Sequence, residues 1–194
     1  MVADLVPTLV APLLSQLCMH FAESGEWVAA SRYALQAIAI RQRSDSALLT
    51  PDFFPQYETE ALLRAGEERQ ARAEVQRLGE RLGHYQRFRL PHLQAMARLA
   101  AWEGHSEQAI SHLREAAGIS AELGLPAEQW QIQARLAGVY EAKGETAQAC
   151  LAWAKASTII QGLAQSIKDE ALRARFLSGP QIQPVLQRVQ GKTL

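Results

Sequence analysis

The sequence has no excess of charge of either sign. Its 194 residues include 20 lysines and arginines and 20 aspartates and glutamates, so the formal net charge at pH 7 is zero. An overall basic surface is typical of nucleic-acid-binding proteins, and this balance argues against one. We therefore expect no nucleic-acid partner. Because 48% of the residues are hydrophobic, the chain has enough apolar side chains for a sizeable core.

Cysteine is scarce. The chain contains only Cys18 and Cys150, and their spacing fits no metal-binding or redox motif. Both lie in predicted helices, beside small residues or in place of them, where we expect buried, reduced thiols with a structural role. Reduced cysteines are usual in the cytoplasm, so we predict a cytoplasmic protein without a metal or a cofactor.

A long uninterrupted hydrophobic run is also missing. The apolar N-terminal stretch contains Asp4, Pro7 and Pro12, and no basic residue precedes Arg32. A secretory signal peptide begins with a positively charged region, and a membrane-spanning helix needs about 20 apolar residues. We interpret the stretch as the first helix of a helical hairpin and expect no membrane association.

Residue patterns of catalysis are absent as well. The sequence has no HExxH or GxSxG motif and no cysteine–histidine pair at a useful spacing. His105 and His112 are seven residues apart on one predicted helix, or roughly 10 Å, which is too far to share one metal ion directly. The stretch from Gly191 to Thr193 is similar to the end of a phosphate-binding loop, but Leu186 stands where that loop needs glycine. We predict that the protein is not an enzyme.

What the sequence does contain is a repeated helical hairpin. Long alternations of Val, Ile and Thr are lacking, whereas Ala, Leu, Gln, Glu and Arg are abundant, so we expect helices and no strands. Glycines recur at separations of 41, 38 and 40 residues; an alanine follows each after five residues, and an aromatic residue, leucine or alanine precedes it by four. The glycines are Gly25, Gly66, Gly104 and Gly144, the alanines Ala30, Ala71, Ala109 and Ala149, and the preceding residues Phe21, Leu62, Ala100 and Tyr140.

Each repeated position has a physical reason. Glycine ends the first helix because the position after the helix favours left-handed backbone angles, which cost other residues about 1 kcal/mol or more. In three copies glutamate follows, where the N-terminal end of the second helix favours negative charge. Alanine lets the two helix backbones approach closely, and the aromatic residue or leucine fills the space between them.

The pattern predicts four hairpins over residues 9–42, 52–82, 91–123 and 126–165, followed by capping helices over residues 167–190. Prolines mark the expected helix starts, which are Thr50-Pro51-Asp52, Pro91, Pro126 and Pro180. A capping-box-like sequence from Ser166 to Asp169 should begin the first capping helix, which should stop at Ser178 and Gly179. The capping helices hide the last apolar face, as a solenoid requires.

The hairpin resembles the tetratricopeptide repeat (TPR). The fourth copy carries that motif's characteristic residues in order: Leu136, Ala137, Tyr140, Gly144, Ala149, Trp153 and Ala156. The third copy matches with Met96, Ala97, Gly104, Ala109, Leu113 and Ala116. The period near 40 residues is similar to the variant in the maltose-regulator (MalT-type) region of bacterial signalling ATPases and LuxR-type regulators. This resemblance implies a right-handed α–α superhelix that forms a single domain over residues 1–194.

The same resemblance implies that the first helix of each pair lines an inner groove. On that template the groove candidates for contact with a partner are Met19, Glu60, Arg64, Gln94, Arg98, Trp102, Gln131 and Glu141. Trp102 lies off the main packing stripe, where it either anchors a partner or packs against the adjacent repeat. Trp130 and Trp153 are expected to pack in the core or between repeats.

The segment of residues 64–98 is basic, with eight arginines against four glutamates, or net +4. Near its centre, aromatic and basic side chains alternate at Tyr85, Arg87, Phe88 and Arg89. Such a pattern suits an anionic partner. The alternative, which we favour, is that the arginines are solvated and that Tyr85 and Phe88 pack inward.

The function that follows is non-catalytic recognition of a protein or peptide, by the sensor or interaction segment of a bacterial signalling or transcription-regulatory system. One alternative is a domain that senses a small-molecule effector, as the similarity to the maltose regulator implies. Another is a structural spacer that forms a homo-oligomer through an open N-terminal repeat, beyond Leu5, Val10 and Leu13.

Overall fold

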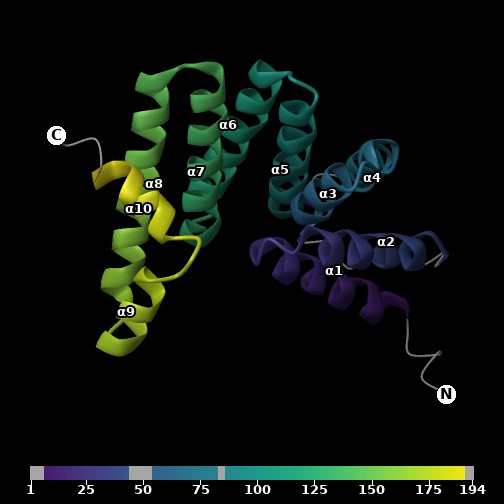
Figure 1. The fold of residues 1–194 in the computed structure, drawn as a ribbon, viewed down its shortest axis with the longest axis horizontal. Coiled ribbons are helices and arrows are strands. Elements are labelled where there is room, and N and C mark those ends of the chain that lie inside the picture. Colours follow the sequence, from purple (N-terminus) through teal and green to yellow (C-terminus); the bar gives the residue numbers. More distant parts are fainter. Residues whose placement is uncertain (1–6, 44–53, 83–85, 191–194) are drawn as a thin grey trace. The chain divides into compact units, whose positions relative to one another are not determined.

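The computed structural model describes residues 7–43, 54–82 and 86–190, and over these residues every regular element is an α-helix (Figure 1). The ten helices in these ranges are α1 (Pro7–Glu23), α2 (Trp27–Arg43), α3 (Pro55–Arg64), α4 (Glu68–Arg81), α5 (Gln86–Trp102), α6 (Ser106–Glu122), α7 (Pro126–Lys143), α8 (Thr146–Ser166), α9 (Glu170–Leu177) and α10 (Gln183–Gln190). The all-α prediction is confirmed. The right-handed superhelical path stays a prediction.

The first eight helices follow the predicted pairs along the chain. The two helices of each pair are separated by a turn of two or three residues, and α9 and α10 occupy the expected capping region. The second pair begins at Pro55, after Phe54, rather than at residue 52. The expected start at residues 50–52 lies outside the described residues.

The chain divides into two compact units. Unit 1, Met1–His105, contains α1 to α5, and unit 2, Ser106–Leu194, contains α6 to α10. In unit 1, α1 packs along α2, and α3 packs on α2, α4 and α5. In unit 2, α7 packs along both α6 and α8, and α8 also carries α9 and α10. Whether the chain is the expected single domain stays a prediction.

The repeated glycines form the same turn in every pair. Their φ angles are 78°, 80°, 80° and 82°, so all are left-handed, as predicted. The residue after each glycine donates its N–H to the carbonyl four positions before the glycine, at 2.8–2.9 Å; these bonds are Glu26 to Phe21, Glu67 to Leu62, His105 to Ala100, and Glu145 to Tyr140. This is the hydrogen bond of the Schellman motif, which satisfies a carbonyl at the helix end.

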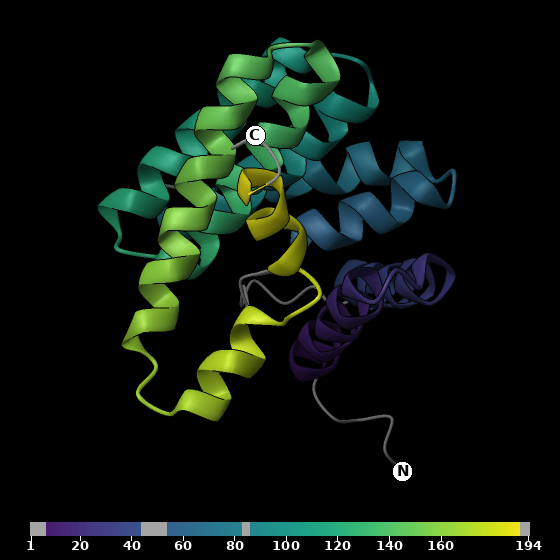
Figure 2. The same ribbon diagram turned by 60° about the vertical axis from the view of Figure 1, so that its left-hand side comes forward.

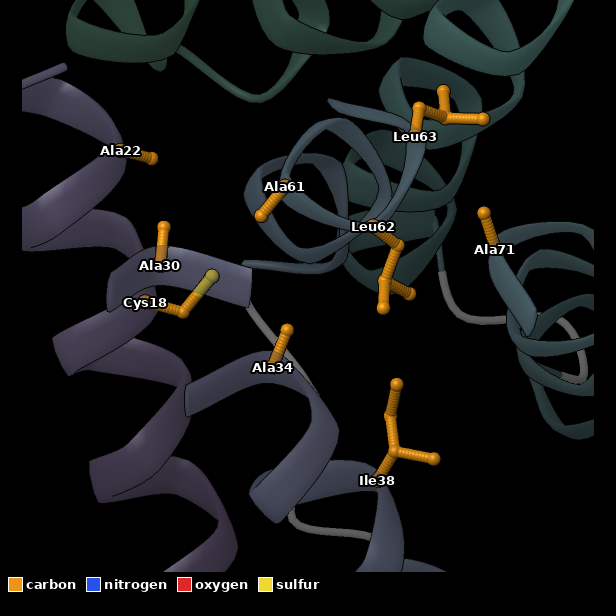
Figure 3. Close-up of a cluster of buried hydrophobic side chains, with 9 residues drawn as sticks. All are labelled: Cys18, Ala22, Ala30, Ala34, Ile38, Ala61, Leu62, Leu63 and Ala71. Atoms are coloured by element: carbon orange, nitrogen blue, oxygen red, sulfur yellow. The ribbon is translucent and has the colours of Figure 1, made fainter. Parts of the chain in front are cut away.

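The repeated alanines lie in the cores, also as predicted. Ala30, Ala71, Ala109 and Ala149 each have 0% of their surface exposed. In unit 1, side chains from α1 to α4 meet in one cluster that includes Cys18, Ile38 and Leu62 (Figure 3). Burial, with a smaller contribution from Glu58, raises the pKa of the Cys18 thiol to about 12, so this cysteine stays protonated. Cys150 is only partly buried, so the expectation of a buried thiol is wrong for this residue.

The core of unit 2 joins the last hairpin to the capping region. Trp130 is 8% exposed, and Trp153 is half-buried against the same cluster, so the expectation that both pack in the core is confirmed. Ile182 and Val185 enter this cluster from the C-terminal side. The capping segment therefore covers apolar surface of α7 and α8.

The third pair begins earlier than predicted. α5 starts at Gln86, so Pro91 lies inside the helix and does not open it. A proline removes one backbone donor and crowds the carbonyl four positions before it, here that of Arg87, close to the helix start. Leu90 and Pro91 are both buried. Their packing stabilises the helical turn before Pro91, although proline alone would favour a helix that starts at residue 91.

Two caps also differ from the prediction. α9 is capped by Asp169, whose side chain accepts a hydrogen bond from the Leu172 N–H at 2.8 Å, whereas Ser166 is the last residue of α8. A carboxylate accepts hydrogen bonds from the unpaired backbone N–H groups in the first turn of a helix, and its negative charge is favoured there. Asp169 therefore caps α9 better than Ser166 would. α10 begins at Gln183, after a turn, and not at Pro180. The stop of α9 at Ser178 is as predicted.

Candidate binding surface

The predicted groove residues fall into both units. Those in unit 1 are Met19 on α1, Glu60 and Arg64 on α3, and Gln94, Arg98 and Trp102 on α5. Those in unit 2 are Gln131 and Glu141, both on α7.

Two arginines of unit 1 share one carboxylate. Arg98 forms an ion pair with Glu60 across the contact between α3 and α5. Arg64, one turn after Glu60 on α3, donates to Glu60 Oε1 from Nε at 3.3 Å and from Nη2 at 3.1 Å. Residues that the sequence placed on one groove are thus in contact.

Two aromatic rings support these arginines. The Arg64 guanidinium lies 4.1 Å from the centroid of the Trp27 ring, and the Arg98 guanidinium lies 5.3 Å from that of Tyr57. Guanidinium groups are attracted to the faces of such rings. Tyr57 in turn donates its hydroxyl proton to Glu23 Oε1 at 3.0 Å. The rings hold the arginines in defined orientations.

Trp102 keeps half of its surface exposed. It is 51% accessible and follows Arg98 by one helical turn. Its indole Nε1 donates to Glu68 Oε1 at 3.0 Å, which fixes the ring beside the start of α4. This exposure is what an anchor for a partner requires; binding itself stays a prediction. We call the surface formed by Trp27, Tyr57, Glu60, Arg64 and Trp102 the Arg–Trp face. Arg98 is only 7% exposed, so it holds Glu60 in place and offers a partner little surface.

Sequence reasoning missed two members of this face, Trp27 and Tyr57. Tyr57 precedes Glu60 by three residues and therefore shares its side of α3, which was a usable signal. Trp27 stands at the start of a second helix, where the repeat template assigns no groove position. In contrast, Gln94 is only 5% exposed, and Met19 is half-buried. Gln94 therefore offers a partner little surface.

In unit 2, Glu141 is engaged by the chain itself. Arg188 Nη1 donates to Glu141 Oε1 and Oε2 at 2.8 and 2.9 Å, and Trp153 Nε1 donates to Oε1 at 3.1 Å. The Arg188 guanidinium also lies 5.6 Å from the centroid of the Trp153 ring. Gln131 is half-buried. α10 therefore covers the predicted contact residue Glu141.

A second ionic cluster lies deeper in unit 1 and ties four helices together. Glu58 on α3 accepts from Ser15 Oγ on α1 at 2.5 Å and from Arg41 Nη2 on α2 at 2.6 Å. Glu74 on α4 lies 3.8 Å from Arg41 Nη2 and accepts from Arg77 Nη2 at 2.6 Å. The Arg41 and Glu58 side chains are only 9% and 5% exposed. No sequence pattern identified these residues as partners.

This cluster lines a small recess. Besides Arg41, Glu58, Glu74 and Arg77, its walls are formed by Thr59 and by four apolar residues, and its empty volume, open solvent included, is ≈ 280 Å³. Ligand sites direct a few polar groups at the ligand. Here the charged groups are directed at one another.

The basic segment near residue 88 is described only in part, and its role in binding an anion stays a prediction. In the first turns of α5, Phe88 is half-buried and Arg89 exposed, while Tyr85 and residues 191–194 lie outside the described residues. His105 pairs with Glu103 at 3.6 Å. Within residues 7–43, 54–82 and 86–190, no group of three or more His, Cys, Asp or Glu side chains is placed to hold a metal ion.

Comparison with known proteins adds no family. No protein-family model matches the sequence, and a search of curated proteins finds no match. Across the helices that the structure describes, none has the length and apolar character needed to cross a membrane. The resemblance to TPR proteins and to the MalT-type region therefore stays a prediction.

Proposed function

We propose that this chain is a non-catalytic recognition module that binds a protein or peptide through the Arg–Trp face. One observation supports this most: Arg64 is stacked 4.1 Å over Trp27 while its side chain keeps 45% of its accessible surface. Arginine and tryptophan often dominate the binding energy at protein interfaces. A stacked, exposed arginine is already oriented before a partner arrives, which lowers the entropy lost on binding.

The unused edge of Arg64 determines what it binds. Its Nε and Nη2 atoms donate to Glu60, whereas Nη1 donates no hydrogen bond to any residue that the structure describes. A guanidinium stacked on an indole presents such an edge to a carboxylate or a main-chain carbonyl. Trp102, one turn beyond Arg98, offers an exposed indole to an apolar side chain of the same partner.

The resemblance to the maltose-regulator repeats supports the biological setting. In this proposal the chain is the sensor or interaction segment of a bacterial signalling or transcription-regulatory system, located in the cytoplasm. The partner is a segment of another protein, and the Arg–Trp face is its site.

A displayed peptide library tests the proposal. Peptides selected on the wild-type chain are measured by fluorescence anisotropy against Arg64→Ala, Trp102→Ala and the control Leu172→Ala, which changes an exposed apolar side chain of unit 2. Loss of a hot-spot side chain costs about 2 kcal/mol, so each of the first two changes should weaken binding about 30-fold. Equal affinity for all variants would show that the Arg–Trp face is not the site.

A second candidate function, self-association, is favoured by the outer side of α1. Leu13 and Leu17 lie one turn apart and are 59% and 40% exposed, and α1 carries no Asp, Glu, Lys or Arg before Glu23. If this stripe joins two copies, Leu13→Glu/Leu17→Glu should sediment as a monomer and the wild type as a dimer. Identical sedimentation coefficients would remove this candidate.

The small-molecule alternative has less support. The recess at Arg41 is lined by arginines and glutamates that neutralise one another. A ligand would have to break the buried pair of Arg41 and Glu58 before it gained any contact with either charge.

A further inference from the structure

Glu141 on α7 and Trp153 on α8 form a seat for a guanidinium group. Both carboxylate oxygens of Glu141 accept from Arg188 Nη1, and the Trp153 ring lies 5.6 Å from the Arg188 guanidinium carbon. The Trp153 indole N–H donates to Glu141 Oε1 at 3.1 Å, which fixes the carboxylate independently of Arg188. An oriented carboxylate beside an aromatic ring suits a guanidinium, which donates to the carboxylate while its flat face lies against the ring.

An apolar surface adjoins this seat. Ile182 and Val185 are 6% and 3% exposed and pack with Trp130 and Ile160, and Leu186 packs against the same cluster. α10 lies against α8 (Figures 1 and 2). Ile182, directly before α10, packs on this cluster with Val185 and Leu186 of α10, and Arg188 follows on α10. The surface recognises a short amphipathic helix by shape and by one charge.

α10 depends on this surface for its own structure. It has eight residues, and an isolated helix of that length is not stable in water. Between residues 178 and 189 only Ile182 and Val185 are buried, and the preceding helix α9 has no buried residue. The Arg188 side chain is 55% exposed. A few contacts therefore hold the segment, and their loss frees the surface beneath it.

We propose that the seat of Glu141 and Trp153, with the adjoining apolar surface of α8, is a binding site for an arginine-bearing amphipathic helix of a partner protein. In the free chain α10 occupies this site as an internal ligand. The partner presents the pattern of α10: apolar residues three and four positions apart, then an arginine two or three positions later. The partner displaces α10, and its affinity is lowered by the fraction of chains in which α10 is seated. This inference uses unit 2 alone and does not depend on the Arg–Trp face.

A peptide with the α10 sequence measures the site directly. A fluorescein-labelled peptide of residues 179–190 is titrated with the full wild-type chain, with Arg188→Ala, and with the control Arg175→Ala, which removes an exposed arginine of α9. Because α10 of the Arg188→Ala chain competes less well, this chain should bind the peptide about tenfold more tightly than the other two. Equal binding by all of them would overturn the proposal.

The chemistry of the seat has its own controls. Adding Glu141→Gln to the Arg188→Ala chain should weaken peptide binding about tenfold, and so should a peptide with lysine in place of arginine at position 188. Affinity that is indifferent to both changes would refute guanidinium recognition. Val185→Asp, which places a charge in the apolar contact, should free the site further; a Val185→Asp chain that keeps its circular dichroism but binds no peptide would also overturn the proposal.

A second copy of the chain is the competing occupant. If α10 of one copy sits on another copy, the wild type should dimerise in sedimentation velocity, and Glu141→Gln should return it to a monomer. That result would assign the site to self-association and refute the heterologous partner. A wild-type monomer that binds the peptide supports the proposal.

Discussion

Gly138 and Gly144 allow the same substitution to be made twice in one helix with opposite expected results. Gly138 lies inside α7 and is exposed, whereas Gly144 caps the C-terminus of α7 with φ +82°. A Cβ added at either position meets no atom within 4 Å. Steric clashes are therefore removed from the comparison, and the backbone angle is the difference that remains.

The expected magnitudes follow from that angle. Gly138→Ala should raise the free energy of unfolding by about 0.5–1 kcal/mol, because alanine loses less conformational entropy than glycine when the helix forms. Gly144→Ala should lower it by about 1–2 kcal/mol, because a left-handed residue brings its Cβ close to the following carbonyl oxygen. The two variants should differ by about 2 kcal/mol, or about 1 M in the urea midpoint if the m-value is about 2 kcal/mol/M.

Urea unfolding monitored by circular dichroism measures the difference. Gly162→Ala, at an exposed interior position of α8 with nothing within 4 Å, repeats the stabilising substitution in the neighbouring helix. The reasoning would be refuted if Gly144→Ala were as stable as Gly138→Ala. That outcome would mean that the turn after α7 takes another conformation in solution at little cost.

Two further predictions concern buried groups of unit 1. Glu58→Ala should lower the free energy of unfolding by about 3 kcal/mol because it removes the closest counter-charge of the buried Arg41 side chain. The double change Arg41→Met/Glu58→Leu removes both charges and should be nearly neutral. Urea unfolding measures both, and a single variant as stable as the double would contradict this reasoning. Cys18 has a pKa of about 12 against 9.0 for an ordinary thiol, so the unfolded state ionises first and the stability contribution falls as pH rises from about 9 to about 12. Cys18→Ala should remove that slope from the pH dependence of unfolding, and a thiol reagent at pH 8 should modify Cys150 before Cys18.

The repeat skeleton was readable from the sequence because its reasons are local. A left-handed residue at the end of a helix calls for glycine, and a close approach of two helices calls for a small side chain, wherever the copies lie. Gly144 and Ala149 therefore have the backbone angle and the burial that their spacing predicted. The bounds of the helices follow from the same positions to within a few residues.

Two of the predicted helix starts at prolines are wrong for a tertiary reason, whereas α7 begins at Pro126 as predicted. The sequence predicts Pro91 and Pro180 as first residues because proline suits the first turn of a helix. The start of α5 instead follows the burial of Leu90 and Pro91, and the start of α10 follows the docking of Ile182. Local propensity carries no information about those contacts.

Ion pairs and hydrogen bonds between side chains could be predicted from the sequence only where both residues lie on the same face of one helix. Glu60 and Arg64 are four residues apart, so their contact follows from helical spacing. The contact between Arg188 and Glu141 joins positions 47 residues apart, and its formation depends on where α10 docks. Glu141 was therefore assigned to an open groove, although the chain's own C-terminal helix covers it.

The buried pair of Arg41 and Glu58 limits how this repeat array can be rearranged. The pair joins α2, the last helix of the first hairpin, to α3, the first helix of the second. Solenoids commonly gain and lose whole repeats because each repeat needs only apolar contact with its neighbours. Exchanging the first hairpin for another repeat would leave the Glu58 carboxylate buried without Arg41 and Ser15, and deleting it would expose the apolar surface of α3 that packs on α2. The first two hairpins are therefore expected to be inherited, transplanted and truncated together, as one module of twice the repeat length.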